Sequence, residues 1–185
     1  AGERAVYCGF LDEPPALTPT PRDCVLVYLG AGSVPAGVAI RAGQELADAL
    51  GCDVYVAGVP EAVRISGGYT VACAPRFDFA ELLPRARVFV HHGGQNSMMD
   101  ALSYEVPQVL VPGRVFERQF NAEAVESARC GLTVREPKPT LIARAARRLV
   151  VDEPALTSGI RGLRAELSSL GGTKRIVCEV EKLVS

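Results

Sequence analysis

The chain has 185 residues, 48% of them hydrophobic, and a formal net charge of −1. A chain of this length and composition buries a core and is not a disordered segment. The near balance of basic and acidic residues excludes a nucleic-acid or membrane-surface partner that is held by bulk charge. No apolar run approaches the roughly 18–20 residues of a membrane helix, so no membrane span is expected.

The N-terminal residues Ala1 to Arg4 lack the pattern of a secretory signal, and no Met begins the sequence. We therefore expect residues 1–185 to form one domain that begins inside a longer protein. The cysteines include no close pair such as C-x-x-C, which argues against a structural metal site and a disulfide framework. Buried free thiols in a reducing cytoplasm are expected instead. The six cysteines are Cys8, Cys24, Cys52, Cys73, Cys130 and Cys178.

Short apolar runs alternate with longer helical patterns along the chain. The predicted strands cover residues 25–29, 53–57, 70–73, 88–90 and 108–111. The predicted helices cover residues 36–50, 81–86, 96–104, 120–129, 140–151, 154–170 and 173–183, and Gly51 is expected to end the first of them. Residues 14–21 hold four prolines and are predicted to form a loop. Together these patterns predict an α/β fold, a Rossmann-like doubly wound parallel β-sheet flanked by helices.

Two predicted strand-to-helix junctions are rich in glycine, namely Gly30-Ala31-Gly32-Ser33 and Gly93-Gly94. In a parallel sheet such junctions meet at the carboxyl edge, where ligands bind. Glycine lets backbone amides approach an anion, and the following helix adds partial positive charge at its N-terminus. The two loops therefore predict a phosphate site. The first loop lacks the third glycine of the dinucleotide fingerprint, so simple chain reversal stays open as its explanation.

Polar side chains follow the second glycine-rich junction. His92 can donate a hydrogen bond to a phosphate oxygen, and Ser97 offers a hydroxyl. Asn96 and Asp100 lie four residues apart, on one face of a predicted helix, and the carboxylate of Asp100 suits a ribose diol. Plainer interpretations stay open: Asn96 or Ser97 caps the helix, and Asp100 complements the helix dipole. His91 is interpreted as a neutral structural histidine.

The ordered run of His92-Gly93-Gly94-Gln95-Asn96-Ser97-x-x-Asp100-Ala101, then Val106-Pro107, Pro112 and Asn121-Ala122, resembles a known signature. It is similar to the donor-site signature of glycosyltransferases related to the UDP-glucuronosyltransferases. The resemblance implies that the chain is the C-terminal, nucleotide-sugar-binding half of a two-domain GT-B architecture. It also implies that Asp100 binds the ribose, where the family has Glu. The implied diphosphate-binding residues are Gly30, Ser33, His92, Gly94, Asn96 and Ser97.

Two parts of the signature differ in this chain. The family's Asp-Gln pair falls on Glu117-Arg118, with Gln119 one step beyond, so these three residues are the candidates for binding the donor sugar. The aromatic residue on which relatives often stack the base aligns with Arg76, and Arg also stacks flat on a base. Phe77 is the competing candidate for the base. The glycine of the family's Gly-Val-Pro is Glu105, which is expected to alter only a surface turn.

The resemblance further implies a reaction. A sugar leaves UDP or dTDP while an acceptor hydroxyl attacks, and no metal or other cofactor is required. The acceptor, a small lipophilic molecule, and the catalytic base are expected on an N-terminal domain outside this chain, so the isolated chain is expected to be inactive. Two alternatives stay open: a nucleotide-sugar-binding module without catalysis, and half of a sugar-nucleotide epimerase.

Overall fold

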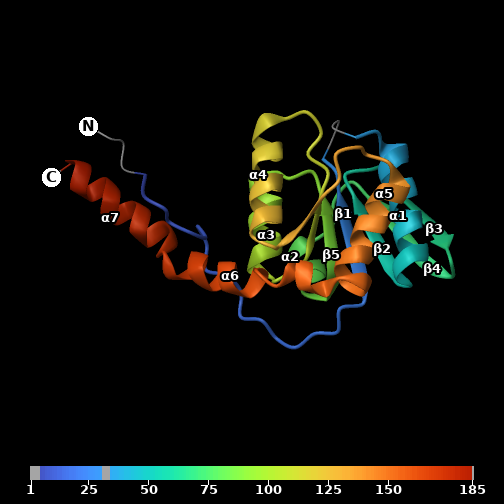
Figure 1. Ribbon diagram of the computed structural model, residues 1–185, viewed down its shortest axis with the longest axis horizontal. Helices are drawn as coiled ribbons and strands as arrows, with labels where there is room; N and C mark the ends of the chain where they lie inside the picture. The colour runs from blue at the N-terminus through green and yellow to red at the C-terminus, as the bar shows by residue number, and fades with distance from the viewer. Residues whose placement is uncertain (1–4, 31–33, 185) are drawn as a thin grey trace.

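The computed structural model describes residues 5–30 and 34–184. Its centre is a seven-stranded sheet in the order β3-β4-β2-β1-β5-β6-β7. All neighbouring strands are parallel except β3 and β4, which are antiparallel. This mostly parallel sheet with helices on both faces confirms the predicted Rossmann-like fold (Figure 1). The strands are β1 (Cys24–Tyr28), β2 (Asp53–Ala57), β3 (Ala62–Ser66), β4 (Tyr69–Ala74), β5 (Ala86–His91), β6 (Gln108–Leu110) and β7 (Gly131–Thr133).

The order of the strands determines where a ligand can bind. From β1 the chain adds β2 and β4 on one side of the sheet, and then β5, β6 and β7 on the other side. The direction of winding therefore reverses between β1 and β5. In doubly wound sheets the loops that leave such a pair of strands diverge and open a crevice at the carboxyl edge. The two glycine-rich junctions of the sequence follow these two strands.

Helices cover both faces of the sheet. Helices α1 (Ala36–Leu50) and α5 (Pro139–Arg147) pack side by side on one face. Helices α2 (Phe79–Leu82), α3 (Gln95–Ser103) and α4 (Phe116–Ser127) cover the other. Successive residues of a strand face opposite sides, so Val25 and Val27 pack in the α1/α5 cluster while Leu26 packs in the cluster of α2 and α3. Burial on both faces explains the continuous apolar strands.

The C-terminal segment extends away from this domain together with the first described residues, which begin at Ala5 (Figure 1). It consists of α6 (Ile160–Ser169), which contacts α3, and α7 (Gly172–Val184), which has no buried residue. The N-terminal residues run beside it: the Gly172 amide donates to the Cys8 carbonyl over 2.7 Å, and the Thr173 hydroxyl donates to the Leu11 carbonyl over 2.6 Å. Residues 14–21 contain no helix or strand, as predicted.

Several element predictions were wrong in detail. Strands β3 and β7 were not predicted. The single helix expected over 154–170 is a 3-10 turn at Pro154–Thr157 followed by α6, and a π turn at Arg148–Asp152 extends α5. Helix α4 begins at Phe116, four residues before its predicted start, and the predicted turn at 81–86 is α2 followed by a 3-10 turn at Leu83–Arg85. Gly51 does end α1, in a left-handed conformation.

The cysteines agree with the prediction for the most part. All six are free. Cys24, Cys52, Cys73 and Cys130 are buried, whereas Cys8 is half-buried and Cys178 is exposed on α7. Over residues 5–30 and 34–184, no helix combines the length and apolar character that crossing a membrane requires.

Candidate functional site

His92 lies at the crevice between β1 and β5. It is the first residue after β5, and its backbone N–H donates to the carbonyl of Tyr28, the last residue of β1, over 3.2 Å. The Tyr28 ring also meets the His92 ring edge to face, with centroids 5.3 Å apart. Tyr28, at the end of β1, therefore holds both the backbone and the ring of His92 in position.

The imidazole of His92 has a defined tautomer. The Gly94 amide donates to its Nδ1 over 2.9 Å, so Nδ1 carries no proton in the neutral ring and Nε2 does. Burial lowers the pKa of His92, and the charge of Arg118 lowers it further. The ring is therefore neutral near pH 7 and offers its Nε2–H as a hydrogen-bond donor.

Glycines from two loops flank this ring. A Cβ at Gly30 would lie 2.8 Å from His92 Cδ2, and one at Gly94 would lie 2.3 Å from His92 Cε1. Any larger residue at either position has to displace the ring. The structure therefore brings the predicted residues Gly30, His92 and Gly94 together. The rest of the first loop, including the predicted Ser33, lies outside the described residues.

Helix α3 presents an open N-terminus beside His92. Gly94 is its N-cap residue, and no side chain caps it, so the capping interpretation of Asn96 and Ser97 was wrong. The first backbone N–H groups of a helix have no partner within the helix and form an anion site. Asn96 is exposed in this first turn, whereas Ser97 is only 7% exposed.

Asp100 lies one turn further along α3. It shares with Asn96 a groove of about 610 Å³ between α3 and residues 9–15 of the N-terminal segment. Burial raises the pKa of Asp100. Burial raises the pKa of Tyr104, and the charges of Asp100 and Asp78 raise it further.

The two candidates for binding the base differ in their surroundings. Both follow β4 at the carboxyl edge. Arg76 is exposed. Phe77 packs on the α2 and α3 side of the sheet, where its ring meets that of Tyr55 edge to face at 5.4 Å. Arg76 is therefore open to a ligand, whereas Phe77 is half-buried and already has an aromatic partner.

The three candidates for binding the donor sugar lie in the first turns of α4. The carbonyl oxygen of Arg118 would lie 3.0 Å from a Cβ at Gly93, so this part of α4 borders the second glycine-rich loop. The charge of Arg118 reaches His92 and lowers its pKa, and that of Glu117 raises it. Gln119 faces another way, because its Nε2 donates to the Gly113 carbonyl over 2.9 Å. Of the two candidates for the family's Gln, Arg118 is the one that borders Gly93 and whose charge affects His92.

Two further side chains support this loop and were not assigned to it from the sequence. His91 is buried, and it accepts a hydrogen bond from the Gly93 amide on Nδ1 over 3.1 Å. Burial lowers its pKa from 6.5 to about 3, so His91 is a neutral structural histidine, as interpreted. Asn121 of α4 donates from Nδ2 to the Gly93 carbonyl over 2.9 Å. The alternation of side chains along β5 is the signal that would have placed His91 and His92 on opposite sides.

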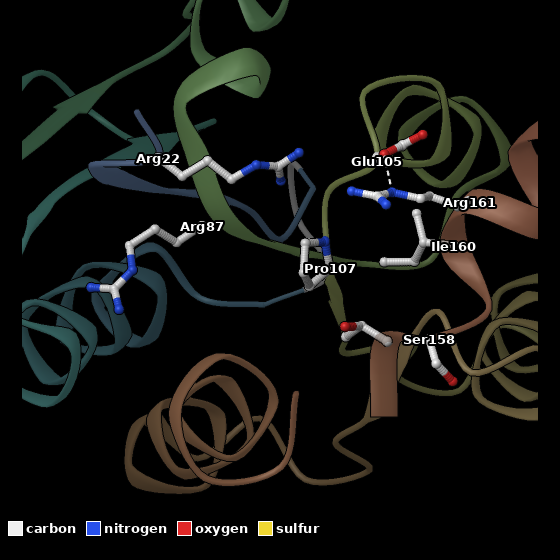
Figure 2. Close-up of a pocket in the computed structure, with 8 residues that line it drawn as sticks. Arg22, Arg87, Glu105, Pro107, Ser158, Ile160 and Arg161 are labelled. Atoms are coloured by element: carbon white, nitrogen blue, oxygen red, sulfur yellow. Dashed lines mark hydrogen bonds and ion pairs between the residues drawn. The ribbon is translucent and has the colours of Figure 1, made fainter. Parts of the chain in front are cut away.

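A second pocket, of about 440 Å³, lies at the amino ends of β1, β5 and β6 (Figure 2). Its arginines already have partners. Arg22 donates to the carbonyls of Ala86 and Tyr104 over 3.0 and 2.9 Å, and Arg87 donates to that of Leu50. Tyr104 and Leu50 end helices, where cations are stabilising. These two arginines therefore serve the fold, and this pocket is not part of the candidate site.

Glu105 also lies in this pocket and occupies the position of the family's glycine. Its φ is 53°, a left-handed conformation that glycine adopts without strain. Its carboxylate forms ion pairs with Arg161 at 3.4 Å and Arg164 at 4.0 Å. Across the part of the chain that the structure describes, no three His, Cys, Asp or Glu side chains gather as metal ligands would.

Comparison with known proteins agrees with the fold. The family model described as "Erythromycin biosynthesis protein CIII-like, C-terminal domain" matches residues 49–183, which is more than half of the chain.

The chain is also similar to individual proteins. It is 28% identical over 102 residues to the NDP-glycosyltransferase YjiC of Bacillus subtilis (strain 168), covering 55% of this chain and 26% of that protein. It is 27% identical over 188 residues to the aclacinomycin-T 2-deoxy-L-fucose transferase of Streptomyces galilaeus, covering 98% of this chain and 42% of the relative.

Among solved structures, the Streptomyces sp. SF2575 glycosyltransferase SsfS6 complexed with thymidine diphosphate is 28% identical, with a TM-score of 0.68. That match covers 96% of this chain and 47% of SsfS6. The chain thus spans less than half the length of each of these relatives. It belongs to the family of C-terminal domains that are like that of the erythromycin biosynthesis protein CIII.

Proposed function

We propose that this chain is the donor-binding domain of a glycosyltransferase and binds a UDP- or dTDP-sugar. One observation carries the proposal: the Nε2–H donor of His92 and the uncapped N-terminus of α3 lie together at the crevice between β1 and β5. Both are groups that bind an anionic diphosphate. The thymidine diphosphate in the related SsfS6 structure supports a nucleoside diphosphate as the ligand.

The donor extends across the site in a definite direction. We assign the diphosphate to Gly30, His92, Gly94 and the first turn of α3, with Asn96 and Ser97. We assign the ribose to Asp100 and the base to Arg76. Arg76 is exposed, whereas Phe77 packs against Tyr55. The sugar then lies toward the first turns of α4, where Arg118 is close enough to His92 to lower its pKa.

In the proposed reaction an acceptor hydroxyl attacks the anomeric carbon of the donor sugar. The bond from that carbon to the diphosphate oxygen breaks, and the diphosphate leaves with the bonding electrons. His92 and the amides of α3 stabilise the negative charge that grows on the leaving group. A base on an acceptor-binding domain outside this chain takes the acceptor proton. These groups supply the stabilisation without a metal ion, so none is required in the proposed reaction.

A lipophilic acceptor is supported by the surface beside the sugar end. Phe116 is 82% exposed and Phe120 is 64% exposed, and they lie one turn apart at the start of α4. Large apolar side chains that are exposed beside a site often mark a binding surface. The named transfer by the Streptomyces galilaeus relative, to an aclacinomycin, points to the same class of acceptor. The free cysteines support a location in the cytoplasm, where thiols stay reduced.

Thermal unfolding in the presence of UDP, dTDP and GDP tests the proposal. A ligand that binds only the folded state at about 100 times its Kd adds about 2.7 kcal/mol to the free energy of unfolding. For a domain of this size we expect UDP or dTDP to raise Tm by roughly 5–10 °C at that excess. If none of these nucleotides raises Tm at millimolar concentration, the donor-binding proposal is rejected.

A second measurement separates donor binding from complete catalysis. We expect the isolated chain to bind the donor without transferring its sugar, because the acceptor base lies elsewhere. Efficient transfer by the isolated chain to a hydroxyl acceptor would contradict this part of the proposal. Transfer by the whole protein distinguishes a glycosyltransferase from a module that only binds the nucleotide sugar and from an epimerase.

A further inference from the structure

The peptide groups of Gly93 are held from two sides by buried side chains. His91, at the end of β5, accepts a hydrogen bond from the Gly93 amide over 3.1 Å. Asn121, on α4, donates to the Gly93 carbonyl over 2.9 Å. Both side chains are buried, at 0% and 5% exposure. Gly93 itself has a φ of 83°, which favours glycine, and both its amide and its carbonyl are hydrogen-bonded to side chains.

Gln108 fixes the orientation of His91. Its Oε1 lies 2.9 Å from His91 Nε2, and because His91 Nδ1 accepts from Gly93, the neutral ring must donate from Nε2 to this oxygen. The Nε2 atom of Gln108 is buried and has no hydrogen-bond partner within the described residues. A buried amide with an unpaired donor destabilises the folded state, because the donor has lost its hydrogen bonds to water. Gln108 is therefore poorly explained as a residue that only stabilises the fold.

The two adjacent histidines have the same contact at Nδ1, but their Nε2–H groups point to different surroundings. Each accepts on Nδ1 from the amide two residues ahead, and each therefore carries its proton on Nε2. The Nε2–H of His91 donates to Gln108 inside the protein. The Nε2–H of His92 lies at the crevice, where a ligand can accept from it. If the Gly93 peptide rotates, the Gly94 amide leaves His92 Nδ1 and the tautomer of His92 is no longer fixed.

We propose that His91, Gln108 and Asn121 are positioning residues for the diphosphate site. They hold the Gly93 peptide so that the Gly94 amide binds His92 Nδ1 and the His92 Nε2–H is presented to the donor. This inference rests on the proposed function for its ligand. Asn121 also belongs to the helix that carries Glu117 and Arg118, so it joins the sugar end of the site to the diphosphate end.

Two variants test the inference in the protein as it stands. Asn121→Ala removes the donor to Gly93, and Gln108→Leu removes the partner of His91 without touching Gly93. We expect each to weaken UDP binding at least tenfold in calorimetry. Binding of uridine, which has no phosphate, should change less than twofold in an NMR titration. The matched control is Val125→Ala, which truncates a buried residue of α4 one turn from Asn121 and should lower Tm with UDP affinity unchanged.

A spectroscopic measurement makes the test independent of the ligand. The chain contains only two histidines, so ¹H–¹⁵N correlation spectra of their rings are readily assigned. We expect both rings to be Nε2–H tautomers in the wild type, and we expect His92 to become a mixture of tautomers in Asn121→Ala.

The outcomes are distinct. If UDP affinity and the His92 tautomer are unchanged in both variants while Tm falls as in Val125→Ala, the three residues are merely structural and the inference is wrong. If the wild type binds no nucleotide but its His92 tautomer shifts in Asn121→Ala, the proposed ligand fails and the positioning of His92 stands.

Discussion

The backbone N–H of Gly94 donates to Nδ1 of His92 over 2.9 Å, and this one hydrogen bond places the imidazole proton on Nε2. A neutral histidine thereby becomes a fixed donor. A charged histidine at the same place would need no such support, but burial and Arg118 lower the pKa of His92 and disfavour the charge. In the proposed site, an anion would therefore be bound by the oriented dipoles of a neutral ring and of backbone N–H groups.

Loss of this donor should be measurable in binding. We expect His92→Ala, and separately Asn96→Ala, to weaken UDP or dTDP binding by at least about 1 kcal/mol, since each removes a hydrogen bond to a charged group. Isothermal calorimetry measures the change, with Glu123→Ala on the exposed side of α4 as the control. Wild-type affinity in a folded His92→Ala protein would reject its assigned role.

The buried histidines should make the fold sensitive to acid. His91 has a pKa of about 3 in the folded chain and an ordinary value of 6.5 when unfolded. Between these values the unfolded state binds the extra proton, so the free energy of unfolding falls as pH falls below 6.5. From His91 alone the loss is about 1.4 kcal/mol per pH unit.

Urea unfolding at pH 7, 6 and 5 checks this dependence. His92, whose pKa is also lowered, adds to the loss with the same sign. In His91→Gln the contribution of His91 is absent, so its stability should fall less steeply with acid than that of the wild type. Parallel curves for the two proteins would show that His91 is not the group responsible.

Substitution of the two candidates for binding the base should give opposite results for nucleotide affinity and Tm. Arg76→Ala should weaken nucleotide binding and leave Tm unchanged within a degree or two, because the side chain is exposed. Phe77→Ala should lower Tm, because its ring packs against Tyr55. Differential scanning calorimetry and a binding titration on both variants decide between them. A nucleotide affinity that falls only in Phe77→Ala, beyond the effect of its lower stability, would reverse the assignment.

Asp100 should respond to the ribose itself. Asp100→Asn is expected to weaken UDP binding roughly tenfold, because a charged acceptor for the hydroxyls is lost. The same substitution should affect 2′-deoxyuridine diphosphate less, since that ligand lacks one of the two hydroxyls. Ser103→Ala is the control, because Ser103 lines the same groove and its hydroxyl donates to the α3 backbone. Equal losses for both ligands would mean that Asp100 does not recognise the ribose.

The sequence predicted the parts of the fold in which pattern and burial agree. The buried parallel strands β1, β2 and β5 are continuous apolar runs, and their positions were confirmed within one or two residues. Strand β3 was missed because it is the exposed antiparallel edge, where Val63 and Ile65 are 72% and 66% exposed and no apolar face is buried. Strand β7 has only three residues, too few to show a period.

The helix predicted over 154–170 is interrupted because of a tertiary contact. A Cβ at Gly159 would lie 1.8 Å from the carbonyl oxygen of Ala128, so the chain must approach α4 at this point and α6 begins only afterwards. In the site, the two glycine-rich junctions predicted that Gly30, His92 and Gly94 lie together. The supporting contacts of His91 and Asn121 were not predicted, because they depend on how β5 and α4 meet.

Helix α7 has a consequence for how this chain unfolds. None of its residues is buried, and Val177, Val180, Leu183 and Val184 are between 49% and 85% exposed. Its backbone amides can therefore open to solvent while the sheet stays folded, and they should exchange hydrogen for deuterium long before those of α1. We therefore expect the 13 residues of α7 to unfold separately from the sheet, and far-ultraviolet circular dichroism should record their melting ahead of the main transition.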